Sequence, residues 1–187
     1  AFWQWALPVI DKHFGEAWTL EDILPHIHHV ERGLIRVDAD EVTYPLHVIL
    51  RYELEEDIIA GRLETKDIPE AWDAKMRDYL GLATIGIPGD GPMQDVHWAA
   101  GAFGYFPSYT LGAMMAAQQW AALTRDYPDA DQDLASGNFA RINAWRRDKI
   151  WSQASRWPTP ELLEYATGEK LEAGHFIGHL RRRYGAA

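Results

Sequence analysis

Helix-boundary signals recur along this chain, and they constrain its fold more than any other feature. A start is marked by a capping side chain or a proline followed by an acidic first turn. These starts are Thr19-Leu20-Glu21-Asp22, Ile68-Pro69-Glu70 and Thr159-Pro160-Glu161. An end is marked by glycine, which accepts the left-handed conformation after the last helical residue. These ends are Gly15, Gly61, Gly137 and Gly168. The spacing predicts many short helices.

Apolar residues at helical intervals fill the segments between these boundaries. They predict helices over residues 2–14, 20–29, 41–60, 69–81, 107–126, 129–135, 138–154, 159–167 and 171–184. Leu34-Ile35-Arg36-Val37 has strand character between two turn-like residues and predicts one short β segment near 33–37. Asp38 or Asp40 is expected to cap the helix over 41–60. The predicted fold class is mainly α, as a single helical region over residues 1–187.

Charge and cysteine content exclude several classes of function. The formal net charge of −10 disfavours nucleic acid as a partner, because an acidic chain repels the phosphate backbone. Without cysteine, the chain forms no disulfide, thiolate metal site or cysteine nucleophile, which fits a cytoplasmic setting. No apolar run is long enough to span a membrane. The chain begins Ala-Phe-Trp-Gln-Trp, without Met, which we interpret as the cut end of a longer chain.

Residues 91–112 form the segment richest in side chains that suit a binding site. Gln94, Asp95, His97 and Trp98 lie within five positions, and Tyr105 and Tyr109 follow. Aimed polar groups beside aromatic surface are typical of a ligand-binding wall. The alternative is a structural loop whose aromatic side chains fill a core and whose Asp caps the next helix.

A polar stripe is predicted on the helix over 41–60. Tyr44, His47, Arg51 and Glu55 are spaced three, four and four residues apart, which places them on one face. The stripe is either a solvated face with one Arg–Glu pair or a face that lines a cleft. The sequence leaves both interpretations open.

The histidines give little support for a metal site within this chain. His26, His28 and His29 do not share one helix face, which favours a solvated helix end. His175 and His179 have the spacing of a zinc pair, but no Glu follows His175, so we expect them to pack like aromatic residues. We therefore predict that no residue of this chain is a metal ligand.

Two motifs carry a resemblance to a known family. Ile35-Arg36-Val37-Asp38-Ala39-Asp40 resembles the Ile-Arg-x-x-Ala-Asp motif of the thermostable (Taq-type) zinc metallocarboxypeptidases. Gly91-Pro92-Met93-Gln94-Asp95-Val96-His97-Trp98 resembles that family's Gly-x-x-Gln-Asp-x-His-Trp motif. The sequence between and after them is similar too, including Phe103-Gly104-Tyr105-Phe106-Pro107 and Ala166-Thr167-Gly168-Glu169. The resemblance spans essentially the whole chain.

The resemblance implies the C-terminal portion of a longer catalytic domain that hydrolyses the last bond of peptides. The family's zinc is bound by a His-Glu-x-x-His helix and a later Glu, which lie N-terminal to the region that this chain resembles. No histidine here is followed by Glu. The resemblance therefore implies zinc in the full-length enzyme, none bound by this chain alone, and no activity of this portion alone. It also implies peptide partners with a free C-terminus, a homodimer and a cytoplasmic location.

The resemblance also assigns roles to individual residues. Arg36 would bind the substrate's terminal carboxylate, because its planar fork matches a carboxylate. Asp38 and Asp40 would cap the following helix and orient Arg36. The remaining expected substrate-binding residues are Gln94, Asp95, Trp98 and Tyr109. The candidate oxyanion or transition-state donors are Tyr44, His47, His97 and Tyr105.

Two other functions compete with this interpretation. One is a non-catalytic helical peptide-binding module that lacks the zinc half. The other is a separate zinc enzyme that would use His26, His29, His175 or His179, which the poor spacing disfavours. Zinc bound by the purified chain would support this last alternative.

Overall fold

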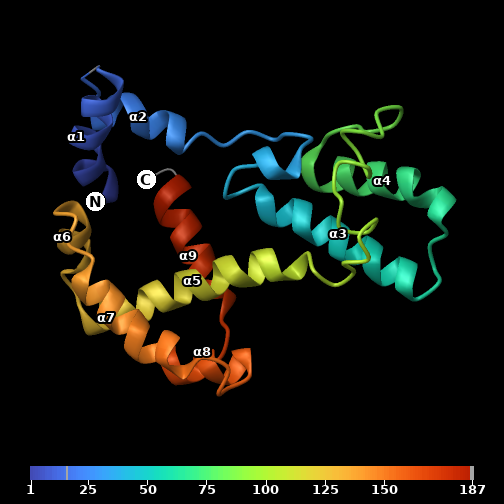
Figure 1. Ribbon diagram of the computed structural model, residues 1–187. Coiled ribbons are helices and arrows are strands. Elements are labelled where there is room, and N and C mark those ends of the chain that lie inside the picture. The colour runs from blue at the N-terminus through green and yellow to red at the C-terminus, as the bar shows by residue number, and fades with distance from the viewer. Residues whose placement is uncertain (16, 186–187) are drawn as a thin grey trace. The chain divides into compact units, whose positions relative to one another are not determined.

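The computed structural model describes residues 1–15 and 17–185, and helices are the only regular elements in them (Figure 1). The α-helices are α1 (Phe2–Phe14), α2 (Leu20–Ile27), α3 (Tyr44–Ile59), α4 (Ile68–Leu80), α5 (Pro107–Asp126), α6 (Ala130–Ala135), α7 (Ala140–Lys149), α8 (Thr159–Thr167) and α9 (Ala173–Tyr184). Three single 3₁₀ turns lie at Arg36–Asp38, Thr65–Asp67 and Trp151–Gln153. The predicted mainly α fold class is confirmed.

The predicted boundary chemistry is visible at several helix ends. Thr19 and Asp22 form a reciprocal capping box at the start of α2, in which each side chain accepts a hydrogen bond from the other's backbone N–H. Of the predicted glycine ends, Gly15 and Gly168 follow α1 and α8 in the left-handed conformation. Gly81, which the prediction left inside the helix over 69–81, follows α4 in the same conformation. Local sequence therefore determines where these helices stop.

The prediction of a β segment near 33–37 is wrong. Arg36–Asp38 form a 3₁₀ turn, closed by a 3.1 Å hydrogen bond from Ala39 N–H to the Arg36 carbonyl. The Arg36 N–H donates to the Gln94 side chain, 2.8 Å away, instead of to a neighbouring strand. Because the Arg36 N–H is bonded to Gln94, it is not available to a neighbouring strand. The strand propensity of these residues therefore does not determine their local structure.

The chain divides into two compact units, with the boundary inside α5. One unit comprises residues 1–28 and 113–183, apart from residue 16. Its buried core joins α5, α6, α7 and α8 through Ala122, Leu123, Ala130, Ile142, Trp145 and Ala166. Hereafter we call it the first unit.

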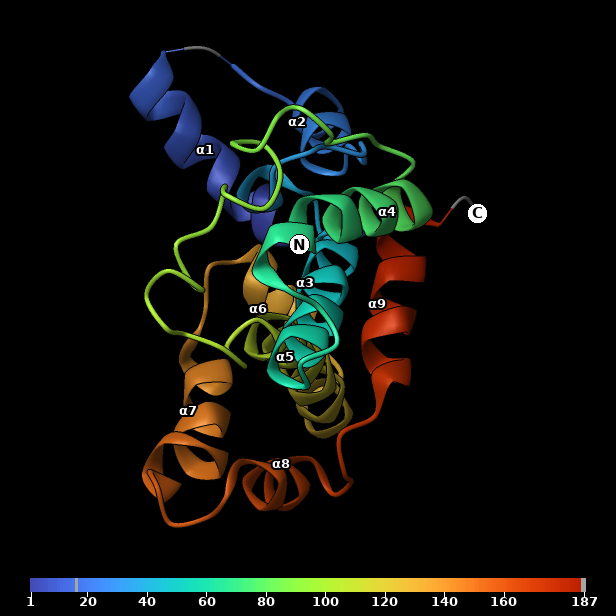
Figure 2. The same cartoon turned by 90° about the vertical axis from the view of Figure 1, so that its right-hand side faces the viewer.

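The second unit comprises residues 29–112, with Tyr184 and residue 185. Its helices α3 and α4 pack on each other through a core of Leu50, Leu54, Trp72, Met76 and Leu80. Between α4 and α5, residues 81–106 run as a long segment of turns without helix or strand (Figure 2). In the described part of the chain, no helix combines the length and the apolar character needed to cross a membrane.

Asp73 on α4 binds the beginning of the segment 81–106 through hydrogen bonds. Its carboxylate accepts hydrogen bonds from the N–H groups of Thr84 and Ile85 and from Arg77 Nε. The hydrogen bond from Arg77, followed by the one from Thr84, lowers the pKa of Asp73 from 3.8 to about 2. A carboxyl group whose pKa is lower in the folded state stabilises the fold above its unfolded pKa.

We therefore expect Asp73 to stabilise the second unit at neutral pH and to lose this effect between pH 4 and pH 2. Asp73→Asn, which removes the charge and keeps the shape, should be less stable than the parent chain at pH 5, and the gap should narrow toward pH 2. Urea unfolding at a series of pH values measures this difference. Asp78→Asn, an exposed change on the same helix, is the control. A gap that stays constant from pH 5 to pH 2 would contradict the assignment.

Candidate active-site region in the second unit

The polar stripe on α3 is buried, and this overturns its interpretation as a solvated face. His47, Arg51 and Glu55 are all fully or almost fully buried, and Tyr44 is half-buried. Residues 95–104 supply the hydrogen-bond partners of Arg51 and Glu55 outside α3, and Arg36 supplies that of Tyr44. Buried polar groups at helical spacing require partners from another segment, and here the partners come from the motif-rich part of the chain.

Arg36, Asp95 and Arg51 form a buried ion cluster. Asp95 Oδ1 accepts from Arg36 Nε and Nη2 at 3.0 and 2.8 Å, and Asp95 Oδ2 accepts from Arg51 Nε at 2.6 Å. Arg36 is 5% exposed and Arg51 is 0% exposed. One carboxylate therefore sets the orientation of two guanidinium groups, and the three side chains together carry one net positive charge.

Burial and pairing shift the three pKa values in different directions. Burial lowers the pKa of Arg36, but its hydrogen bond and attraction to Asp95 outweigh burial and raise it overall. For Arg51 burial dominates and lowers the pKa to about 10. Burial raises the pKa of Asp95, but the two arginines reverse this and lower it overall. All three groups are therefore charged at neutral pH.

Arg51 is held from several sides. Its Nη1 donates to the His47 carbonyl at 2.7 Å, and its guanidinium carbon lies 4.5 Å from the ring centroid of Trp72 and 5.4 Å from that of Phe106. Its Nη2 is buried without a hydrogen-bond partner among the described residues. Stacking on aromatic faces suits a buried guanidinium, because the ring quadrupoles attract the cation.

Gln94 connects the two motifs through its side-chain amide. Its Oε1 accepts from the Arg36 N–H, and its Nε2 donates to the Leu34 carbonyl at 3.1 Å. The same Nε2 donates to the carbonyls of Asp90 and Gly91 at 2.8 and 3.1 Å. Gln94 therefore holds the backbone on both sides of Arg36 against the turn that precedes Asp95.

Aromatic side chains surround the Arg36 guanidinium. Arg36 Nη1 donates to the Tyr44 hydroxyl at 2.6 Å, and the Tyr109 ring centroid lies 5.1 Å from the guanidinium carbon. His97 Nε2 and the Tyr109 hydroxyl are hydrogen-bonded at 2.9 Å, and the Tyr105 ring lies 5.7 Å from the His97 ring. Tyr105 is 52% exposed. The cluster thus extends from a buried cation to a phenol at the surface.

The structure brings together the sequence-predicted site residues, although their surroundings differ. Arg36, Tyr44, Gln94, Asp95, His97, Tyr105 and Tyr109 lie within one network of hydrogen bonds and ring contacts. Trp98 instead donates through Nε1 to Glu55 Oε1 at 2.7 Å. His47 is fully buried, and burial followed by the charge of Arg51 lowers its pKa to about 4. His47 is therefore neutral and lies beneath the surface.

The expectation that Asp38 and Asp40 orient Arg36 is not what the structure shows. Asp40 caps the turn before α3, accepting from the N–H groups of Val42 and Thr43, both at 2.9 Å. It also accepts from the Glu31 N–H. Asp95 orients Arg36 instead. The prediction that Asp38 or Asp40 caps the helix is wrong in detail, because α3 begins at Tyr44 with Thr43 as its N-cap and no side-chain capping bond, and Asp40 caps only the turn before it.

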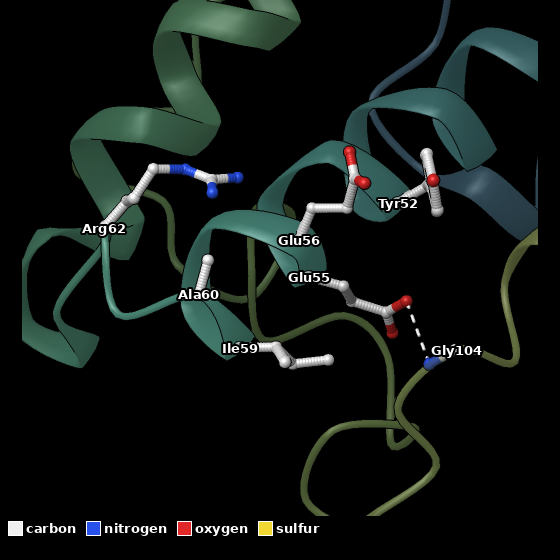
Figure 3. A pocket seen from close by; sticks show the side chains of 7 residues that line it. All are labelled: Tyr52, Glu55, Glu56, Ile59, Ala60, Arg62 and Gly104. Carbon is white, nitrogen blue, oxygen red and sulfur yellow. Dashed lines mark hydrogen bonds between the residues drawn. The ribbon is translucent and has the colours of Figure 1, made fainter.

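Sequence reasoning missed the importance of Arg51 and Glu55. Both belong to the α3 stripe, and their helical spacing with Tyr44 and His47 was the only signal available. Glu55 is 2% exposed and accepts a hydrogen bond from Trp98 Nε1. It also accepts one from the Gly104 N–H (Figure 3). Its carboxylate also borders a shallow pocket lined by Tyr52, Glu56, Ile59, Ala60 and Arg62.

The described residues do not form a zinc site. Among them, no three His, Asp or Glu side chains come close enough to hold a metal ion. His175 Nε2 lies 2.7 Å from Glu169 Oε1, and the His179 ring stacks on Phe176 with centroids 6.3 Å apart. His29 pairs with Glu31 at an exposed position.

Comparisons with known proteins agree with the motifs. The model of the carboxypeptidase Taq (M32) metallopeptidase family matches residues 1–184. Thermostable carboxypeptidase 1 of Thermus thermophilus is 42% identical over 99% of this chain, and carboxypeptidase 1 of Bacillus subtilis is 41% identical over 89% of it. Among solved structures, metallocarboxypeptidase 1 of Trypanosoma cruzi superposes with a TM-score of 0.95 at 44% identity, over 99% of this chain.

The matches cover only part of these relatives. The chain spans 36% of the Thermus protein, 33% of the Bacillus protein and 39% of the Trypanosoma chain. It therefore corresponds to about a third of the length of the proteins it resembles. Because the family model covers nearly all of this sequence, the chain belongs to the carboxypeptidase Taq (M32) metallopeptidase family.

Proposed function

We propose that this chain is the C-terminal portion of a zinc-dependent metallocarboxypeptidase, one helical part of a longer catalytic domain. The enzyme would remove C-terminal residues from peptides. The observation that carries the proposal is the family match over residues 1–184, together with the partial coverage of the Thermus, Bacillus and Trypanosoma relatives. The family resemblance extends the proposal to a homodimer in the cytoplasm.

The cluster around Arg36 supports a role in recognising a free carboxylate. An exopeptidase must distinguish the charged end of a peptide from an internal bond. Arg36 uses three of its five N–H donors on Asp95 and Tyr44, and the ion cluster retains one net positive charge. A substrate carboxylate would neutralise this charge. Gln94, Asp95, Trp98 and Tyr109 would shape the wall around the substrate's end.

Four polar side chains are candidates for stabilising the transition state. Tyr44, His97 and Tyr105 lie in the cluster that extends from Arg36 to the surface. A donor aimed at the developing oxyanion contributes roughly 3 kcal/mol. His47, the fourth candidate, is buried and neutral, so its contribution would pass through the groups packed on it.

Zinc does not fit the described residues of this chain, because they bring no three potential ligands together. The proposal therefore places the metal on the remainder of the enzyme and assigns no step through it to residues of this chain. What this chain would contribute is recognition of the substrate's end and polar donors beside it. By itself it is expected to be inactive.

Hydrolysis of paired substrates tests the proposal. A polypeptide that joins this chain to the preceding part of the enzyme should release the last residue of a free-acid peptide. The C-terminal amide of the same peptide should react at least about 100-fold more slowly, because truncating a charged partner costs about 3 kcal/mol or more. A chelator should abolish the activity.

The alternative function is a non-catalytic peptide-binding module. It would bind free-acid peptides in the longer polypeptide without hydrolysing them, with or without added zinc. Cleavage of internal bonds, or equal rates on acid and amide, would contradict the carboxypeptidase proposal. Elemental analysis of this chain alone should find no stoichiometric zinc. One zinc per chain would instead require a histidine site, which the spacing of the histidines disfavours.

A further inference from the structure

Glu55 is a buried carboxylate of α3 whose hydrogen-bonded partners are neutral. Trp98 Nε1 donates to Oε1 at 2.7 Å, and the Gly104 N–H donates to Oε2 at 3.1 Å. Burying an ionised carboxylate is costly unless its oxygens are satisfied, and here each oxygen receives one donor. Figure 3 shows the second bond crossing from α3 to the segment that carries Gly104.

The two donors lie at the two ends of a single turn. Residues 99–103 between them are mostly exposed and are held internally by the bonds from Gly101 N–H to the Trp98 carbonyl and from Ala102 N–H to the His97 carbonyl. Gly104 has a φ of 77°, a conformation that favours glycine. The hydrogen bonds of the Glu55 carboxylate therefore hold both ends of this turn against α3.

Two of the candidate donors, His97 and Tyr105, adjoin the two ends of this turn. His97 directly precedes Trp98, and Tyr105 directly follows Gly104. Their rings lie 5.7 Å apart, and each ring also contacts Tyr109. Tyr105 is half-exposed, and its carbonyl accepts from the N–H and the Oγ of Ser108 at 3.0 and 2.7 Å. The start of α5 therefore holds Tyr105 on one side, and the bond between Gly104 and Glu55 holds it on the other.

We propose that Glu55 is a positioning residue, which holds Tyr105 and His97 in the arrangement that the reaction requires. This inference rests on the proposed function. Glu55 can affect the reaction through its hydrogen bonds only if Tyr105 or His97 acts on the substrate. A displacement of about 1 Å in a reacting group can cost roughly 100-fold in rate. Loss of the bond to Gly104 permits such a displacement.

Glu55→Gln tests the role with little change in volume. Trp98 and Gly104 donate to different oxygens of Glu55, and a glutamine in the same place offers an NH₂ group at one of those two positions, so one of the two bonds is lost. In the complete enzyme we expect kcat to fall about 10- to 100-fold while KM changes less than about threefold. Glu56→Gln is the matched control, since this exposed neighbour borders the same pocket and its kcat should stay at the parent value.

A double-mutant cycle separates positioning from stability. If Glu55 acts through Tyr105, Glu55→Gln should add little to the defect of Tyr105→Phe, because coupled residues are not additive. Hydrogen exchange at the Gly104 amide, which needs no activity, should be faster in Glu55→Gln than in Glu56→Gln. If Glu55→Gln is too unstable to assay, Glu55→Asp keeps the charge but shortens the reach, and its kcat should fall in the same way.

Three results would overturn the inference. One is a parent-like kcat in Glu55→Gln despite faster exchange at Gly104, which would make the hydrogen bonds purely structural. The second is that the effect of Glu55→Gln on kcat multiplies fully with the effect of Tyr105→Phe and also with that of His97→Gln, which would show that Glu55 acts through neither residue. The third is unchanged exchange at Gly104. Inactivity of the parent enzyme on free-acid peptides would instead refute the proposed function itself, and this role with it.

Discussion

Asp95→Asn is expected to destabilise the second unit by roughly 3–5 kcal/mol, because removing one partner of a buried ion cluster leaves uncompensated charge. Asp95 is the counter-ion of both Arg36 and Arg51, whose side chains are almost fully buried. An asparagine fills the same space but cannot neutralise two guanidinium groups. Because the chain divides into two units, amide hydrogen exchange at Leu50 and Leu54, in the core of the second unit, is the suitable measurement.

The order of related variants makes this prediction more specific. Arg51→Met should cost less than Asp95→Asn, since it leaves a balanced Arg36–Asp95 pair and keeps an apolar chain near Trp72. Asp90→Asn, an exposed change in the preceding turn, should be nearly neutral. If Arg51→Met proved as damaging as Asp95→Asn, excess positive charge would not be the main cause of the destabilisation. The packing of the Arg51 side chain would then be the main contribution of the ion cluster to the stability of the second unit.

Helix ends were predictable because their causes are local. The capping box at Thr19 and the left-handed glycines after α1, α4 and α8 need only neighbouring residues. The β segment near 33–37 failed for the opposite reason. The bond that fixes Arg36 comes from Gln94, 58 residues away. The sequence around Arg36 contains no information on where the Gln94 side-chain oxygen lies.

The site was predictable in composition but not in arrangement. The density of polar and aromatic residues over 91–112 indicated a wall, and the structure gathers them around Arg36. The α3 stripe was ambiguous, because polar residues at helical spacing face either solvent or a buried partner. Arg51 finds its partner 44 residues away, and Glu55 finds one 43 residues away. Burial of a charge is decided by such tertiary contacts.

Arg36→Met in the complete enzyme is expected to reduce kcat/KM on free-acid peptides by about 100- to 1000-fold, since truncating one side of a buried charged pair costs roughly 3–4 kcal/mol. It should also abolish the preference for the acid over the C-terminal amide. The amide lacks the charge that Arg36 would recognise, so its slow hydrolysis should change little. Rates on the paired substrates measure both effects.

Stability and charge controls separate this effect from misfolding. In contrast to Asp95→Asn, Arg36→Met leaves Asp95 paired with Arg51 through the 2.6 Å bond, so hydrogen exchange in the second unit should change far less than kcat/KM. Arg36→Lys keeps the charge without the planar fork and should be intermediate. Arg62→Gln, which removes an exposed arginine of the same unit, should leave the rates unchanged. An acid preference that survives Arg36→Met would place carboxylate recognition on other residues, and Arg36 would then serve only to hold Asp95 and Tyr44.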